Sequence, residues 1–333
     1  MLNVFYGRED IDKQRYLFAR ARAESLARGQ DGSVLLIVPD QFTLETERAA
    51  FDYLEAPAFV DPVVTSMNRL AGRVLAETGG RTDYIDQYGK YMLIARLLHR
   101  GREALSVYRG LENSTAFIEK VSAAIMSFKT HLVTPDALAS AVEAMEGDSL
   151  LRRKLVDLLW IYRGYEEALA AMDGGAGRPD STDVTRLFAA RIRASAFLRG
   201  AVVWVYGYDY ISPLYTEAIA GMACVCAEVN VVLTAEPGDA FFALTNRTCE
   251  ALCEAARAAG SEAAVHGIAE DGARRGVPCA YREKDARPEQ IAHIERALFA
   301  YGGAGAPVFA GAAGEAGGVP PALRLVAARD FES

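Results

Sequence analysis

The sequence predicts an α/β fold in which a parallel sheet is interrupted by a helical insertion. Two apolar, β-branched runs, at 33–39 and 201–206, have the pattern of strands buried on both faces of a parallel sheet. Residues 84–198, between these runs, show helical periodicity and few strand signals. Helix-like stretches also separate the strand-like runs on either side of the insertion, as crossover connections between parallel strands do.

Residues 1–83 are expected to form the first part of the α/β domain. A short apolar run at 2–6 ends at Gly7, and a helix-like stretch follows over 11–28. The strand-like run at 33–39 comes next, after a glycine-containing turn. Strand, helix and strand joined by short connections form a βαβ unit.

Residues 84–198 are expected to form a helical insertion subdomain. Apolar side chains step by three and four residues over 117–128 and 151–165, which is the spacing of one buried helix face. A third helix is expected to begin at Thr134, a capping residue followed by proline at the first helical position. The Gly- and Asp-rich stretch 173–184 is expected to be a loop. We interpret these helical stripes as core.

Residues 199–320 are expected to complete the α/β domain. The strand-like runs are 201–206 and 229–235, and the helix-like stretches are 213–223 and 245–259. A discontinuous α/β domain with a helical insertion fits the first half of a helicase-type motor, and it also fits other nucleotide-binding folds.

The C-terminal stretch predicts a connection to a further domain. Residues 300–321 are rich in Gly, Ala and Pro, which favours a flexible linker. A strand-like run at 322–328 follows, and a lone strand needs neighbours with which to pair. We therefore expect 321–333 to begin a following, truncated domain, and the alternative is a natural end that pairs with the edge of the sheet.

Composition and charge narrow the function classes. The formal net charge of −8 argues against a free-standing protein that coats nucleic acid nonspecifically, although it leaves room for a local basic surface. No apolar run approaches the roughly 18–20 residues of a membrane helix, and no signal peptide is evident at the N-terminus. The expected location is cytoplasmic, with no membrane partner.

The cysteines do not predict a disulfide framework, because their number, five, is odd. Cys249 and Cys253 have the i, i+4 spacing that places two thiolates on one helix face, where they could bind a metal. No matching pair of Cys or His ligands occurs elsewhere. Buried, reduced thiols are the favoured interpretation.

A degenerate phosphate-binding loop is the main candidate for chemistry. A P-loop, GxxxxGK[ST], cradles phosphates with backbone N–H groups, binds them with its lysine and holds Mg²⁺ with its hydroxyl. Residues 7–14 (GREDIDKQ) keep the first glycine and the lysine at the right spacing. The second glycine is Asp12, however, and Gln14 replaces the hydroxyl residue. The candidate nucleotide-binding residues are Gly7, Arg8, Lys13 and Gln14; the alternative is that Lys13 is an exposed helix lysine.

The second motif of a working motor is also altered. An acidic residue is needed at the end of the strand at 202–205, to hold Mg²⁺ and orient the attacking water. Tyr206 occupies that position, and Asp209 lies three residues further on. The four histidines are scattered, and no nucleophile elbow or compact carboxylate cluster of a nuclease is visible. No catalytic residue is therefore predicted, and binding of ATP with Mg²⁺ is in doubt.

Several segments, in order along the chain, resemble the N-terminal region of AddB/RexB proteins. The matching segments are FYGR at 5–8, LIVPDQFTLETE at 36–47, VTSMNRLA at 64–71, VWVYGY at 203–208 with Ser212-Pro213 after it, VLT at 232–234, and IERALF at 294–299. The VPDQ segment with its following helix is the most specific of these, and the resemblance spans essentially the whole chain.

The resemblance implies a P-loop NTPase fold of the RecA-like, superfamily-1 helicase-like type. It implies a subunit that works with an AddA-type motor and nuclease subunit on single-stranded and double-stranded DNA ends, in recombinational repair of double-strand breaks. In that family the helicase-like part of the AddB chain is associated with scanning a single strand. An iron–sulfur cluster is expected only in a C-terminal nuclease domain that this sequence does not contain.

The resemblance also implies a DNA-contacting surface. By position, the segments after the second and third strands match motor-domain elements that contact a single-stranded backbone. The candidate DNA-binding residues are Gln41, Phe42, Thr43, Thr65, Ser66 and Arg69. Hydroxyl, amide and guanidinium groups suit phosphates, and Phe42 suits base stacking. The alternatives are helix capping by Thr43 and Ser66 and core packing by Phe42.

Overall fold

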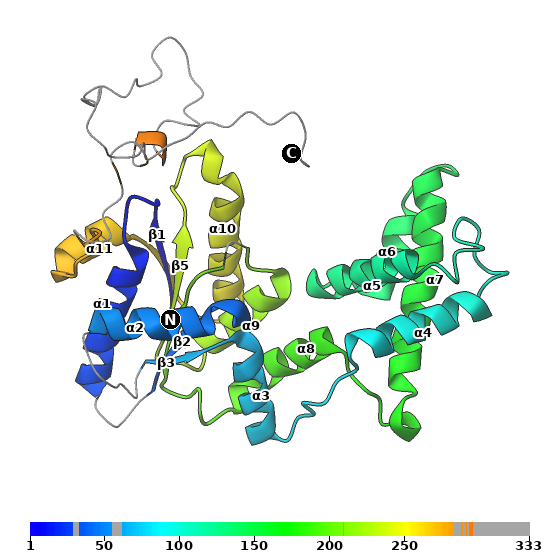
Figure 1. The fold of residues 1–333 in the computed structure, drawn as a ribbon, viewed down its shortest axis with the longest axis horizontal. Helices are drawn as coiled ribbons and strands as arrows, with labels where there is room; N and C mark the ends of the chain where they lie inside the picture. The colour runs from blue at the N-terminus through cyan, green and yellow to red at the C-terminus, as the bar shows by residue number, and fades with distance from the viewer. Residues whose placement is uncertain are drawn as a thin grey trace, which may run out of the picture.

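The computed structural model describes residues 1–28, 33–54, 62–208, 210–282, 288, 291 and 293–295. Within them, six strands form one parallel sheet in the order β3-β2-β4-β5-β1-β6 (Figure 1). The strands are β1 (Leu2–Gly7), β2 (Val34–Ile37), β3 (Val63–Thr65), β4 (Val202–Val205), β5 (Glu228–Thr234) and β6 (Ala263–Gly267). The predicted α/β fold with a parallel sheet is confirmed, and it is consistent with a RecA-like fold. The predicted linker and final strand lie outside the described residues.

Helices cover both faces of the sheet. On one face lie α1 (Lys13–Arg28), α2 (Thr43–Leu54) and α11 (Ile268–Arg275), and on the other lie α3 (Met67–Thr78), α8 (Ser181–Arg191), α9 (Pro213–Ala223) and α10 (Ala243–Ala258) (Figure 1). Successive strand residues alternate between the two cores: Leu35 faces the α3/α8 side, and Leu36 faces the α1/α2 side. This double burial explains the continuous apolar runs of β2 and β4.

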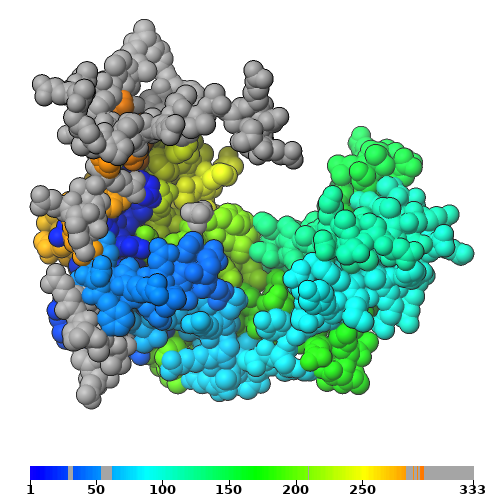
Figure 2. All heavy atoms as spheres, viewed as in Figure 1, coloured from blue at the N-terminus to red at the C-terminus, as the bar shows by residue number. Residues whose placement is uncertain are grey.

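The insertion forms a helical arm that projects from the sheet domain (Figures 1 and 2). Its helices are α4 (Gln87–Arg100), α5 (Thr115–Thr130), α6 (Pro135–Glu143) and α7 (Leu150–Ala170). Ile94, Val121, Ile161 and Tyr165 are buried in its own core. The helix predicted to begin after Thr134 does so, and the threonine side chain accepts a hydrogen bond from the Ala137 N–H.

Helix α8 joins the arm to the sheet domain. The loop predicted over 173–184 ends earlier, because Asp180 caps α8 with a complete capping box and the helix begins at Ser181. The first residues of this helix contact the arm through α5, whereas Val184 and Phe188 enter the core beneath the sheet. The division of the chain at 84 and 198 stays a prediction.

The cysteines are free thiols in the structure. Cys253 is buried, and burial raises the pKa of the Cys249 thiol to about 12, so both sulfurs are protonated near neutral pH. In the described part of the chain, no group of three His, Cys, Asp or Glu side chains is placed to share a metal ion. None of the described helices is both long and apolar enough to cross a lipid bilayer.

Candidate nucleotide-binding turn and DNA-binding edge

The turn from β1 to α1 lies at the carboxyl edge of the sheet. Gly7 ends β1 beside Thr234 of β5, and β5 separates β1 from β4, the strand that Tyr206 follows. Ligands of open α/β sheets bind outside the carboxyl ends of the strands. The fold therefore places the P-loop-like segment and the altered second motif where a nucleotide site would be.

Lys13 is not the exposed helix lysine of the alternative interpretation, because only 5% of it is accessible to solvent. Its Nζ donates to Glu9 Oε1 at 2.8 Å and to the Arg8 carbonyl at 2.9 Å. The same Glu9 oxygen accepts a hydrogen bond from Thr234 Oγ1 at 3.0 Å. The ammonium that would meet phosphates in a P-loop is thus paired with a carboxylate of its own turn.

Asp12 occupies the anion position at the start of α1. Its Oδ1 accepts from the Arg15 N–H at 2.9 Å, and its Oδ2 accepts from the Tyr53 hydroxyl at 2.7 Å. The side chain is buried. A helix N-terminus favours negative charge and offers unpaired N–H groups, which is why phosphates bind there. In this chain a carboxylate already uses that site.

Tyr206 and Gln14 are neighbours at the altered motifs. Burial raises the pKa of Tyr206, and the carboxylates of Glu9 and Asp12 raise it further, so the phenol stays neutral. Tyr206 does not supply the carboxylate, and Gln14 does not supply the Ser/Thr hydroxyl, that hold Mg²⁺ in a motor. Asp209 lies outside the described residues.

The turn is covered by a segment far along the chain, which the sequence pattern did not predict. The Asp12 N–H donates to the Cys279 carbonyl at 2.8 Å, and Arg15 Nη1 donates to the Ala280 carbonyl at 2.7 Å. The Tyr281 hydroxyl donates to the Glu9 carbonyl at 3.1 Å. These bonds tie both the loop and the first turn of α1 to residues 279–281.

Arg8 points to the connection between β5 and α10 rather than into the turn. It donates to Glu295 Oε1 at 2.9 Å and to Asp239 Oδ2 at 3.2 Å, and its guanidinium lies over the Phe242 ring. The structure therefore gathers Gly7, Lys13 and Gln14 at one turn, while the charge of Arg8 is neutralised beside it.

The second candidate region is the carboxyl edge of β2 and β3. Ile37 pairs with Thr65 at this edge, so the segments that follow the two strands are neighbours. Asn68 Nδ2 donates to Asp40 Oδ2 at 2.6 Å and joins the two segments. Gln41 and Arg69 are exposed on either side of this link.

The hydroxyl candidates of this edge are used within the fold. Ser66 is fully buried, and its Oγ accepts from the Arg69 N–H at 3.3 Å, so the capping interpretation is confirmed for this residue. Thr43 is buried, and its Oγ1 donates to the Asp40 carbonyl at 3.1 Å. Thr65 is half-buried and has only a long contact with the Ser66 carbonyl, at 3.5 Å.

The exposure of Phe42 contradicts the interpretation that this ring packs in the core, because 42% of the residue is accessible to solvent. A second exposed ring lies near the arm: Tyr210 stacks on His131, and its hydroxyl is 3.1 Å from His131 Nε2. Sequence reasoning missed this ring, although its signal was present in the alternate tyrosines of the YGYDY run at 206–210. The two rings are exposed aromatics of the segments that follow β2 and β4.

Comparison with known proteins agrees with this architecture. A family described as "ADDB, N-terminal" matches residues 4–293. The chain belongs to the AddB N-terminal family. The AddB N-terminal match extends across the sheet strands, the helical arm and both candidate regions.

Individual relatives share one name, which describes the B subunit of an ATP-dependent helicase/deoxyribonuclease. The protein of Desulforudis audaxviator is 32% identical over 309 residues, which cover 90% of this chain and 25% of the relative. The protein of Moorella thermoacetica is 31% identical over 310 residues, which cover 89% of this chain and 26% of the relative. That of Alkaliphilus metalliredigens is 29% identical over 236 residues, which cover 71% of this chain and 20% of the relative. This AddB-type chain spans about a quarter of the length of such relatives.

Proposed function

We propose that this chain is the helicase-like N-terminal module of an AddB-type helicase–nuclease subunit in recombinational repair of DNA breaks. In this proposal it binds single-stranded DNA along the carboxyl edge of β2 and β3, scaffolds an AddA-type motor subunit and does not hydrolyse ATP. The observation that carries the proposal is the contrast between the two regions of one edge. The P-loop-like turn is filled by its own carboxylates, whereas Phe42 and Arg69 are exposed a short way along the sheet.

Single-strand binding is testable at the residues that remain exposed. A base can stack on Phe42, and the guanidinium of Arg69 can meet a phosphate. We expect Phe42→Ala to weaken binding of a labelled oligothymidylate at low salt roughly tenfold, because stacking contributes about 1–3 kcal/mol per base. We expect Arg69→Ala to weaken it less and to reduce the slope of log K against log salt by about 0.7.

Fluorescence anisotropy of the oligonucleotide measures both effects. Leu26→Ala and Arg257→Ala are matched controls, because both side chains are exposed and lie on α1 and α10, away from this edge. Equal affinities for all four variants and the parent chain would instead support a purely structural scaffold.

Nucleotide binding is testable on the unmodified chain. We expect a fluorescent ATP analogue with Mg²⁺ to show no saturable binding in the micromolar range, because Lys13 and the N-terminus of α1 are already paired with Glu9 and Asp12. Saturable binding that is abolished by Lys13→Ala would overturn this part of the proposal. It would favour the alternative function, a residual ATPase that uses Lys13.

A further inference from the structure

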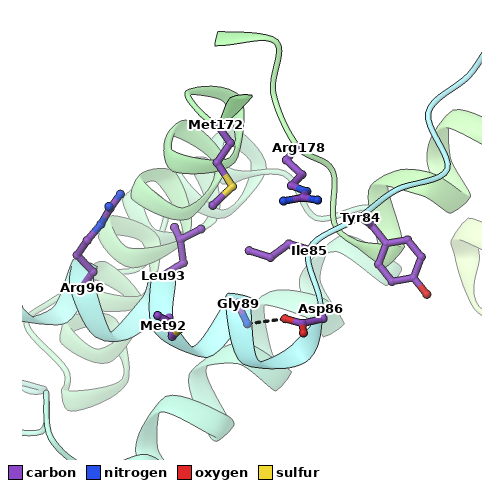
Figure 3. A pocket seen from close by; sticks show the side chains of 9 residues that line it. All are labelled: Tyr84, Ile85, Asp86, Gly89, Met92, Leu93, Arg96, Met172 and Arg178. Carbon is purple, nitrogen blue, oxygen red and sulfur yellow. Dashed lines mark hydrogen bonds between the residues drawn. The ribbon is translucent and has the colours of Figure 1, made fainter. Parts of the chain in front are cut away.

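The helical arm carries a groove between α4 and the C-terminal half of α7. Two hollows of about 530 and 630 Å³ lie along it, and Arg96 lines both. Figure 3 shows the first, where Met172 approaches Leu93 and Ile85 from the opposite side. Neither candidate region described above contributes to the lining of this groove.

The floor of the groove is apolar and closely packed. It is formed by Leu97, Leu159 and Ala168 and by the backbone of Gly164. A Cβ at Gly164 would lie 3.0 Å from Leu97 Cδ2, so glycine allows the two helices to approach closely there. Small and aliphatic residues at the base of a groove between helices admit the apolar face of another helix.

The rim of the groove is basic, in contrast to the acidic chain as a whole. Arg96, Arg100, Arg163 and Arg178 line it, against the acidic Asp86 and Glu167. The Asp86 carboxylate accepts a hydrogen bond from the Gly89 N–H as the N-cap of α4. Arg96 and Arg100 are exposed, and neither makes a hydrogen bond or ion pair with any other described residue. Two of the four guanidinium groups therefore have no partner within the described chain, whereas Arg163 pairs with Asp136 and Arg178 with Asp83.

Large apolar side chains extend the groove along α4. Met92, which lines the first hollow, is 74% exposed and stands one turn before Arg96 on α4. Trp160, on α7, lies against the backbone of Gly101 and is partly exposed. Exposed apolar residues next to unpaired charges are typical of a protein–protein contact.

We propose that this groove binds an amphipathic helix with an acidic face, supplied by the AddA-type motor subunit. The apolar face of that helix would lie on the Leu97–Ala168 floor, and its carboxylates would pair with Arg96 and Arg100. Helix α4 has 14 residues and is therefore about 21 Å long, which suits a partner helix of three to four turns. This inference rests on the proposed function, because it names the site at which the motor subunit docks.

A peptide fits this groove better than single-stranded DNA does. The floor is aliphatic, and the two rings of the lining, Tyr84 and Trp160, belong to different hollows, whereas a strand-binding groove presents a series of rings on which successive bases stack. The exposed Met92 adapts its shape to a protein partner but offers a base no ring.

The test uses the full-length AddB-type subunit and the motor subunit of the same organism. We expect Arg96→Glu to weaken their association about tenfold and to lower its dependence on salt, measured by biolayer interferometry. The matched control is Arg153→Glu, an exposed arginine at the other end of α7. A photo-cross-linking amino acid in place of Met92 should label an acidic helical peptide of the motor subunit, which mass spectrometry identifies.

The outcomes distinguish failure of the groove proposal from failure of the proposed function. If the unmodified subunits do not associate, the scaffolding role itself fails. If they associate and Arg96→Glu behaves like Arg153→Glu, or if the cross-link forms to DNA or to a peptide without acidic residues, the groove proposal is overturned and the scaffolding role remains. Oligothymidylate binding of Arg96→Glu should equal that of the parent, because the strand-binding edge lies on the sheet domain.

Discussion

Replacing Lys129 with methionine is expected to lower the free energy of unfolding by about 3–5 kcal/mol. The lysine is fully buried at the base of the arm. Its Nζ donates to Asp180 at 2.7 Å and to Asp183 and Glu166 at 2.8 Å each. Methionine keeps the length of the side chain but leaves the buried Asp180 and the partly exposed Asp183 and Glu166 without this counter-ion. Removing one partner of a buried ion pair is strongly destabilising.

Urea denaturation of the variant and of Lys120→Met measures this loss. Lys120 is exposed on the same helix, so its replacement should change the free energy of unfolding by less than about 0.5 kcal/mol. If Lys129→Met lowers the free energy of unfolding by less than about 1 kcal/mol, the cluster of Lys129 and its three carboxylates does not stabilise the fold.

The pH dependence of this effect has a definite sign. Burial alone lowers the pKa of Lys129, but the carboxylates of Asp180, Asp183 and Glu166 outweigh it and raise the pKa. The stability that the lysine contributes is therefore fully present below its unfolded pKa of about 10.4, and it is lost only as pH rises through the folded value. Burial raises the pKa of Glu166, and Lys129 opposes that shift. In Lys129→Met this opposition is lost, so the deficit in stability should narrow as pH falls from about 7 to 5.

The same cluster fixes the arm on the sheet domain. Lys129 lies on α5 and Glu166 on α7, whereas Asp180 and Asp183 begin α8, whose later residues enter the core beneath the sheet. The Tyr165 hydroxyl also donates to Asp180, at 3.1 Å. Under the proposed docking of a motor subunit on the arm, loss of Lys129 should therefore weaken that association as well as folding, because the groove of the arm would no longer be held in place.

The elements with strong periodicity were predictable from the sequence, and those made by tertiary contacts were not. The β-branched runs of β2 and β4 and the apolar stripes of α5 and α7 can be recognised in the sequence. Their buried residues recur at the regular spacing of a strand or a helix. Strand β6 has the sequence AAVHG, which carries no such pattern. It is a strand because β1 pairs with it.

The candidate site shows the same limit. Asp12, Gln14 and Tyr206 could be identified as departures from a P-loop motor, because the motif fixes their positions relative to strands. The covering of the turn could not, since Asp12 bonds Tyr53 and Cys279 and Glu9 bonds Tyr281, all from distant parts of the chain. The exposure of Phe42 likewise depends on how the short 3-10 turn at Asp40–Phe42, before α2, lies against the sheet.

Asp271→Asn is expected to destabilise the chain by about 3–4 kcal/mol, because it removes the charge at the centre of a buried cluster. The carboxylate accepts from the Tyr16 hydroxyl at 2.5 Å and from Arg20 Nη1 at 2.9 Å, and it also pairs with Arg274 and Arg275. Arg20 is itself buried, so the variant would leave it with Glu24 alone as counter-ion. Glu270→Gln, on the exposed face of α11, is the matched control in urea denaturation.

The sign of the pH effect here is opposite to that of Lys129. Burial alone raises the pKa of Asp271, but hydrogen bonds from Tyr16, Arg274 and Arg275 outweigh it and hold the pKa well below its usual range. The stability that this carboxylate contributes is therefore present above the unfolded pKa of about 3.9, and it is lost as pH falls through the folded value. The difference between parent and variant should be constant from about pH 5 to 8 and should shrink in stronger acid.

Asp271 also bears on the filled nucleotide turn, because α11 leads directly into residues 279–281, which cover that turn. Loosening α11 from α1 would free the Asp12 N–H and the Glu9 carbonyl from their partners. If that segment alone excluded the nucleotide, Asp271→Asn would gain saturable binding of the ATP analogue. We expect no gain, because Glu9 and Asp12 themselves remain at the phosphate position.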